Sequence, residues 1–286
     1  MKRELFIVLV ALLSLQARAY ELSSDADTSD KETHMVEMRQ SAAVSLPFAE
    51  KWDVMLSEEI REVLYDSNQS PTAYFSKSYT SAALGWKFFS YTDTYNNYKY
   101  GLKLQAGYTL RYLHQKLYSS GVKQGPEEFL RHRPYAVLSG SANFGLVKLT
   151  LRERFLADCR ADSVNVLEKP KCNMELRHRL TADFNLPGKT YKPFTCIEFA
   201  NTLNQPSCYN ASGVQLYGGQ YLCAVRAKVG LRWNIDKKNQ LTFAYSFHFS
   251  QQREVNITRK SQEINRLYMD QTYKHVVTVS YEFNNK

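Results

Sequence analysis

The segment from Tyr98 to Leu113, YKYGLKLQAGYTLRYL, alternates between two kinds of residue almost without a break. Its even-numbered positions are apolar or aromatic as far as Tyr112, whereas most odd-numbered positions are polar or glycine. Because successive side chains of an extended strand point to opposite faces, this strand has one apolar face and one polar face. It predicts a sheet whose two faces meet different environments.

The start of the chain has the features of a secretory signal peptide. Residues 1–19, MKRELFIVLVALLSLQARA, begin with a basic pair, continue with an apolar run and end in the small-x-small triplet ARA. This pattern predicts cleavage between Ala19 and Tyr20 and export of the mature chain. The apolar run is too short for an anchoring helix, which needs about 20 residues to span a bilayer.

Composition further limits the class of protein to which the chain can belong. The mean hydropathy is -0.45, and no other segment is apolar enough for a helical span, which excludes a helical membrane protein. A transmembrane β-barrel is not excluded, because its alternating strands average to ordinary hydropathy. Twenty Tyr and fifteen Phe suit the aromatic girdles of such barrels, although these residues also favour strands in any all-β protein. The net charge of +9 is dispersed and comes without a nucleic-acid module, so no nucleic-acid partner is expected.

Strand patterns recur along the rest of the chain. We expect a signal peptide over 1–19, a flexible periplasmic lead-in over 20–47 and a barrel domain over 48–286. Within the barrel domain, alternation predicts strands at about 50–65, 76–91, 97–114, 133–142, 145–157, 173–186, 191–202, 219–235, 239–251 and 274–284.

The predicted connections alternate between short and long. Tight turns rich in turn formers fall at 92–96, 143–144, 187–189 and 236–239, and longer loops fall at 66–75, 115–132, 158–172, 203–218 and 252–273. Short periplasmic turns and long external loops are typical of outer-membrane barrels, and an even strand count puts both termini in the periplasm. The strand from Trp52 to Tyr65 fits least well, because its apolar face also carries Glu58, and a bulge near 57–59 would restore the parity.

Seven segments spread over nearly all of the mature chain carry a family resemblance: KWDVMLSEEIREVLYD, KYGLKLQAGYTLRY, LTLRERF, ELRHRLTADFNLP, VRAKVGLRWNID, LTFAYSF and HVVTVSYEF. They resemble the uncharacterised outer-membrane barrels grouped as domain of unknown function 2490. The resemblance implies an outer-membrane barrel of Gram-negative bacteria and brings no established activity. The chain departs from such barrels in its five Cys and in the residues Asn284-Asn285-Lys286 that follow the last aromatic residue, Phe283.

Strand parity assigns a basic interior to the barrel. The predicted lumen residues are Lys99, Lys103, Arg111, Lys148, Arg152, Arg154, Arg177, Arg179, Arg226, Lys228 and Arg232, against the acidic Glu175, Asp183, Glu198 and Glu282. Barrels of about eight strands are filled by side chains, so about ten strands predict a packed or narrowly wet interior. These charges either pair into a network that fixes strand register or line a narrow anion-preferring pore.

Catalytic signals are weak. His248 with Ser246, Ser250 and Ser280 is the only candidate for a lipid hydrolase, and the chain has no G-x-S-x-G motif. The other histidines lack metal-ligand spacing, so neither a metal site nor a cofactor is expected.

The cysteines suggest disulfides, since the predicted periplasmic route is oxidising. Cys159 and Cys172 bracket one long loop and form the preferred pair; Cys196 with Cys208 is a second candidate. Cys223 would be a free thiol on the lipid-facing side of its strand. All five could also remain reduced.

The sequence thus predicts an all-β, antiparallel transmembrane barrel of about ten strands, with roughly eight to twelve possible, located in the outer membrane. Its expected role is structural or binding, through external loops and a basic, mostly packed lumen. The alternatives are a narrow anion-preferring pore or transporter, and a lipid-active hydrolase. Outer-membrane lipids and the barrel-assembly machinery, reached through the C-terminal strand, are the expected partners. A soluble lipocalin-like barrel is the rival fold, and it would turn the apolar face of Tyr98–Tyr112 inward.

Overall fold

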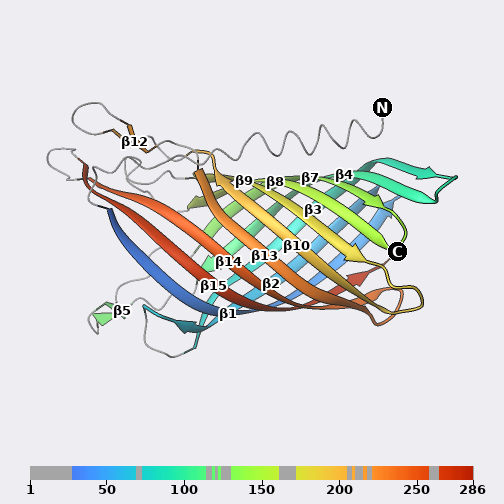
Figure 1. The fold of residues 1–286 in the computed structure, drawn as a ribbon, viewed down its shortest axis with the longest axis horizontal. Coiled ribbons are helices and arrows are strands. Elements are labelled where there is room, and N and C mark those ends of the chain that lie inside the picture. The colour runs from blue at the N-terminus through green and yellow to red at the C-terminus, as the bar shows by residue number, and fades with distance from the viewer. Residues whose placement is uncertain are drawn as a thin grey trace.

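The computed structural model forms a closed β-barrel, seen from the side in Figure 1. The structure describes residues 28–68, 73–113, 118–119, 122–123, 130–160, 172–204, 208–209, 215–217, 221–257 and 264–285. Within these ranges no helix is long and apolar enough to span a membrane.

Eleven of the described strands form the barrel wall. In chain order they are β1 (Thr28–Ala49), β2 (Trp52–Asp66), β3 (Tyr74–Asp93), β4 (Tyr98–Leu113), β7 (Leu130–Asn143), β8 (Val147–Arg160), β9 (Cys172–Phe184), β10 (Tyr191–Thr202), β13 (Tyr221–Asn234), β14 (Asn239–Ile257) and β15 (Ile264–Asn284). Two small hairpins lie in long connections: β5 (Tyr118–Ser119) with β6 (Val122–Lys123), and β11 (Cys208–Tyr209) with β12 (Gln215–Tyr217).

The ten strands from β2 to β15 correspond to the ten strands predicted from alternation, and they form a continuous antiparallel meander. The all-β barrel with a strand count between eight and twelve is therefore confirmed. From Thr28 onward the predicted flexible lead-in over 20–47 was wrong, because these residues form strand β1. The predicted signal peptide, its cleavage site and residues 20–27 lie outside the described residues. β1 is held by backbone pairing to β2 on one side and to β15 on the other.

The barrel closes through a parallel seam. β1 runs antiparallel to β2 but parallel to β15, with Thr28 opposite Leu267 and Ser45 opposite Asn284. Beyond the strand, the Asn285 backbone N–H donates to the Ser45 carbonyl at 3.1 Å. Bacterial single-chain outer-membrane barrels have an even number of antiparallel strands, so eleven strands with a parallel closure are a departure. Thr28, the first described residue, lies at the end of the barrel opposite to Asn284, whereas the predicted even number of antiparallel strands would start and finish at one end.

Short and long connections lie at opposite ends of the barrel. The short turns span 50–51, 94–97, 144–146, 185–190 and 235–238, and the long connections follow β2, β4, β8 and β10 at the other end. Positive φ angles at Asn97, Gly145 and Gly188 mark three of the tight turns. In the last turn, Asp236 accepts hydrogen bonds from the Asn239 side chain and from the backbone N–H groups of Lys238 and Asn239, and these bonds lower the pKa of its carboxyl. The connection from β14 to β15 spans only 258–263, because both strands extend beyond their predicted ends.

The apolar face of β4 points outward. Leu104 and Tyr108 are each 42% exposed, whereas Gln105 is 9% and Thr109 3% exposed on the opposite face. The rival lipocalin-like arrangement requires the apolar face to be inside and is therefore wrong. β14 shows the same alternation, with Phe243 exposed and Ser246 buried.

Exposed aromatic side chains gather at the short-turn end. Trp52 stacks on Trp86 with ring centroids 5.7 Å apart, and each has a further aromatic neighbour, Phe48 and Phe88 respectively. Further pairs join Tyr91 to Tyr100 and Tyr98 to Phe144. Aromatic girdles at this level are typical of membrane barrels.

Bulges lie elsewhere than predicted. β2 pairs without a register shift around Glu58, which lies on the outer face opposite Ala42 and Thr80, so the bulge expected at 57–59 was wrong. The shifts occur further along, where Leu64 of β2 and Ser76 of β3 have no partner in the register. An unpaired residue of this kind changes which face the following side chains occupy.

Candidate functional site

The inner face of the barrel is polar and charged. The structure places on it the basic residues Lys99, Lys103, Arg111, Lys148, Arg152, Arg154, Arg177, Arg179, Arg226, Lys228 and Arg232, and the acidic residues Glu175, Asp183, Glu198 and Glu282. It adds Glu37, Arg39, Asp53, Glu59, Arg61, Arg131, Arg133 and Asp158, which strand parity had not singled out.

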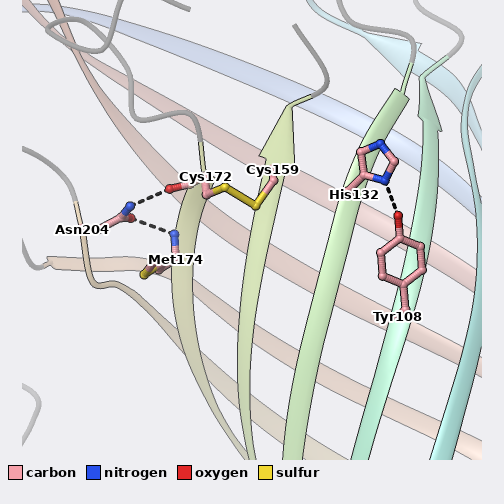
Figure 2. The surroundings of a disulfide bond; sticks show 6 residues. All are labelled: Tyr108, His132, Cys159, Cys172, Met174 and Asn204. Carbon is pink, nitrogen blue, oxygen red and sulfur yellow. Dashed lines mark hydrogen bonds between the residues drawn. A yellow bond between two sulfur atoms is a disulfide. The ribbon is translucent and has the colours of Figure 1, made fainter. Parts of the chain in front are cut away.

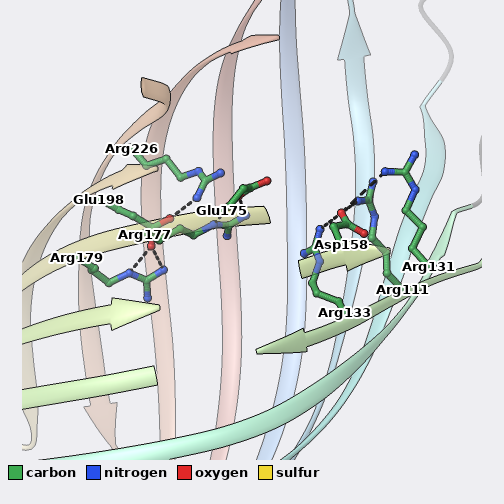
Figure 3. Close-up of polar contacts among 9 residues, drawn as sticks. All are labelled: Arg111, Arg131, Arg133, Asp158, Glu175, Arg177, Arg179, Glu198 and Arg226. Atoms are coloured by element: carbon green, nitrogen blue, oxygen red, sulfur yellow. Dashed lines mark hydrogen bonds and ion pairs between the residues drawn. The ribbon is translucent and has the colours of Figure 1, made fainter. Parts of the chain in front are cut away.

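Asp158 on β8 is the anionic centre of one cluster (Figure 3). Its Oδ2 accepts from the Arg111 guanidinium at 2.6 Å and from Arg133 at 2.5 Å, with Arg131 at 3.9 Å. The side chain is only 5% exposed. Three cations around one buried carboxylate hold β4, β7 and β8 in register, since displacing any of them would leave a buried charge without its partner.

Tyr79 on β3 connects this cluster to the next. Its ring lies 4.3 Å from the Arg61 guanidinium, 5.5 Å from that of Arg133 and 6.0 Å from that of Arg111. Cations within about 6 Å of an aromatic face are attracted by the ring quadrupole. One buried tyrosine ring therefore attracts arginines from three other strands.

Glu37 on β1 is the second anionic centre. It accepts from Arg39 Nε at 2.5 Å and lies 3.9 Å from Arg61, which itself donates to Glu59 at 2.5 Å. Contacts thus run without a break from Glu37 through Arg61 and Tyr79 to Asp158. We call this set the lumen brace; it spans β1, β2, β3, β4, β7 and β8.

A separate cluster lies on the facing wall, also drawn in Figure 3. Glu198 on β10 accepts from Arg179 Nε at 2.6 Å and from Arg226. On β9, Arg177 donates to Glu175 at 2.7 Å and 3.0 Å. β9, β10 and β13 are therefore linked by side chains as well as by backbone hydrogen bonds.

Two smaller contacts lie near the short-turn end. Lys103 donates to both carboxylate oxygens of Asp53, at 2.7 and 2.8 Å. Gly85 lies beside this pair: a Cβ there would be 2.3 Å from Asp53 Oδ1 and 2.4 Å from Lys103 Cε, so the ends of both side chains would have to move to admit one. Arg232 pairs with Asp183.

The predicted hydrolase candidates face the lumen. Ser246 Oγ lies 3.0 Å from His248 Nε2, but Ser246 is 1% exposed, and the other ring nitrogen of His248 lies 3.4 Å from Arg39 Nη2. A catalytic triad places a carboxylate at that position to orient and charge the imidazole, whereas here it meets a cation. Ser280 is hydrogen-bonded to Ser41 at 2.7 Å, and Ser250 pairs with Ala224 in the strand register. These four residues therefore form no Ser-His-carboxylate triad in the described structure.

Cys159 and Cys172 form the predicted disulfide (Figure 2). They are directly opposite in the register of β8 and β9, so the bond joins the strands where the long connection begins. Next to it, the Asn204 side chain accepts from the Met174 N–H at 2.7 Å and donates to the Cys172 carbonyl at 2.5 Å.

Two other cysteines are free. Because Cys196 is free, its pairing with Cys208 was wrong. Cys223 is also free. It is skipped in the pairing of β10 with β13, which makes it a bulge, so the alternation that predicted a lipid-facing Cys223 does not continue through this position. Tyr221, before the bulge, is correspondingly buried.

Ionisable residues also occur on the outer face. His178 on β9 contacts Glu153 on β8, directly opposite in the register and between outward-pointing apolar residues. Figure 2 shows a second outer contact, from Tyr108 to His132. In the part of the chain that the structure describes, no three His, Cys, Asp or Glu side chains are grouped to hold a metal ion.

Comparison with known family models, curated proteins and solved structures gives no match to this chain.

Proposed function

We propose that the chain is an outer-membrane barrel that is closed to ion flow and has a structural or binding role at its long-connection end. The signal-like N-terminus, the exposed apolar face of β4 and the aromatic band around Trp52 and Trp86 support the location. The resemblance to the domain of unknown function 2490 barrels points the same way. Short turns would face the periplasm and long connections the outside.

The lumen brace is the observation that carries the closed state. Its carboxylates Glu37 and Asp158 are 1% and 5% exposed, and arginines from three strands meet around the Tyr79 ring of a fourth. An open channel needs a continuous wet path, and larger barrels leave one because their side chains cannot reach across. In this barrel the ion pairs of the lumen brace and the Tyr79 ring occupy the interior along the inner face from β1 to β8.

Conductance of the refolded protein in a planar bilayer tests this closure. The wild type should carry no steady current. Tyr79→Ala removes the ring between three arginines and should produce an anion-selective current, because the exposed groups are cationic. Tyr108→Ala is the matched control, since Tyr108 lies on the outer face and its loss should open nothing.

A steady anion current through the wild type would overturn the closed state and establish the narrow anion-preferring pore as the function. Membrane location is tested separately, by fractionation of cells that express the full chain. Recovery of the folded protein in the soluble periplasmic fraction would contradict the outer-membrane proposal. Association with the barrel-assembly machinery through β15 belongs to the same proposal.

A further inference from the structure

A row of charged side chains crosses β8, β9, β10 and β13, on the wall that continues from the lumen brace at β8. Arg152 of β8 is paired in register with Arg179 of β9, Arg179 with Glu198 of β10, and Glu198 with Arg226 of β13. All four point inward and form one row along the hydrogen-bonding direction of the sheet. A single carboxylate thus lies in a row with three guanidinium groups.

The neighbouring positions add to the imbalance. Arg154 is paired in register with Arg177, and Lys228 lies one inward position from Arg226. The cations of this wall are Arg152, Arg154, Arg177, Arg179, Arg226 and Lys228, and its carboxylates are Glu175 and Glu198. Six cations against two carboxylates leave a surplus of four positive charges.

The carboxylates are already used by other arginines. Glu198 binds Arg179 and Arg226, and Glu175 binds Arg177. Among the described residues, Arg152 and Arg154 have no hydrogen bond to an acceptor, and the Nε of Arg154 is buried without a partner. The Arg154 guanidinium lies over the Tyr135 ring, 4.2 Å from its centroid, and a ring face does not accept the in-plane N–H bonds of a guanidinium as an oxyanion would.

Burying cations without partners is costly, so a surplus of this size favours the binding of anions beyond those that the described part of the chain supplies. Guanidinium groups present a planar fork of donors that matches phosphate and carboxylate oxygens. This wall is open to the lumen at two of its arginines: the Arg179 side chain is 40% exposed and that of Arg226 24%. A small anion can therefore approach it from within the lumen.

We propose that Arg152, Arg154 and Arg179 form a binding site for a small multivalent oxyanion, with inorganic phosphate as its simplest member. A multivalent anion offsets several surplus charges at one site, which a chloride ion cannot do. The inference goes beyond the proposed function, since it needs only the barrel interior and neither its location nor its closure.

Isothermal titration of the refolded, disulfide-bonded protein with inorganic phosphate at constant ionic strength tests the site. The wild type should bind saturably, with no comparable heat from chloride. Arg152→Gln with Arg154→Gln should weaken phosphate binding by at least about tenfold, since each removes a charge-assisted donor set. Lys103→Gln, a paired lumen cation on another wall, should leave binding unchanged.

Absence of saturable binding by the wild type would overturn the site, whatever the variants do. Equal binding by the wild type and the double variant would also overturn it, as would tighter binding of succinate than of phosphate. If the double variant fails to fold, Arg152→Lys keeps the charge and loses the guanidinium fork. It should bind phosphate several-fold more weakly than the wild type, and unchanged binding would count against the site.

Discussion

Ser41 on β1 donates a hydrogen bond from its Oγ to the Oγ of Ser280 on β15, at 2.7 Å, across the parallel seam that closes the barrel. The two residues are directly opposite in the register and 239 positions apart in the chain. Without β1, the described strands would form an antiparallel meander with free edges on β2 and β15. This contact is therefore a direct marker of the closed barrel.

A disulfide engineered at this seam should form spontaneously. Neighbouring strands lie about 4.7–4.9 Å apart, which is within the Cα separation that a disulfide spans. In a background with Cys196, Cys208 and Cys223 changed to Ala, Ser41→Cys with Ser280→Cys should give a cross-linked species of altered mobility on non-reducing gels. Ser41→Cys with Ser246→Cys is the control, because β14 is not adjacent to β1. A folded barrel in which the first pair stays reduced would contradict the parallel seam.

Neutralising Asp158 should destabilise the barrel strongly. Asp158→Asn leaves Arg111 and Arg133 buried without their carboxylate, and breaking a buried ion pair from one side costs about 3–5 kcal/mol. The measurement is the free energy of unfolding from urea titration in detergent. Glu50→Gln, in an exposed turn, should change it by less than about 0.5 kcal/mol. Equal stability of the two variants would show that the Asp158 cluster contributes nothing.

A methyl group at Gly85 should displace the Asp53–Lys103 pair. Gly85→Ala places a Cβ 2.3 Å from Asp53 Oδ1, so the ends of both side chains must move, and the loss of their ion pair should cost about 1 kcal/mol. Gly101→Ala is the matched control on the adjacent strand, where the nearest atom to the new Cβ is Ser141 Oγ at 3.4 Å. Urea unfolding should separate the two variants, and a neutral Gly85→Ala would show that the pair moves without a loss of stability.

The Cys159–Cys172 disulfide should stabilise the barrel. Its cysteines are 13 residues apart, and closing a loop of that size contributes about 3 kcal/mol in the chain-entropy model. Replacing both by Ser should lower the unfolding free energy by about this amount, and Cys196→Ser should have little effect because Cys196 is free. An unchanged unfolding free energy in the double variant would contradict this contribution.

Alternation located β4 and β14 well because one of their faces is apolar and the other polar. It missed β1 because both faces of that strand are mixed: Glu37 and Arg39 point inward, while His34 and Gln40 lie on the outer side. A strand with polar residues on both faces has no period-2 hydrophobic signal. Its place in the barrel depends on pairing with β2 and β15, which the local sequence does not encode.

The sequence contains a pattern that marks some of the ion pairs and that strand parity alone does not reveal. Glu-x-Arg occurs at Glu37–Arg39, Glu59–Arg61 and Glu175–Arg177, and in each case the two side chains pair on the inner face. Residues two apart on a strand share a face, so this repeated spacing could have identified three pairs of the lumen. The bulges at Leu64 and Cys223 could not have been found this way, because an unpaired residue shows itself only in the register with neighbouring strands.

The parallel seam also sets the order of assembly. β1 is the first barrel strand to be synthesised, yet one of its two partners, β15, is the last. Joining segments that far apart costs loop-closure entropy before any contact repays it, and contacts of high sequence separation slow folding. One edge of β1 therefore stays unpaired until β15 has been synthesised. A truncated chain that lacks β15 cannot form the closed barrel.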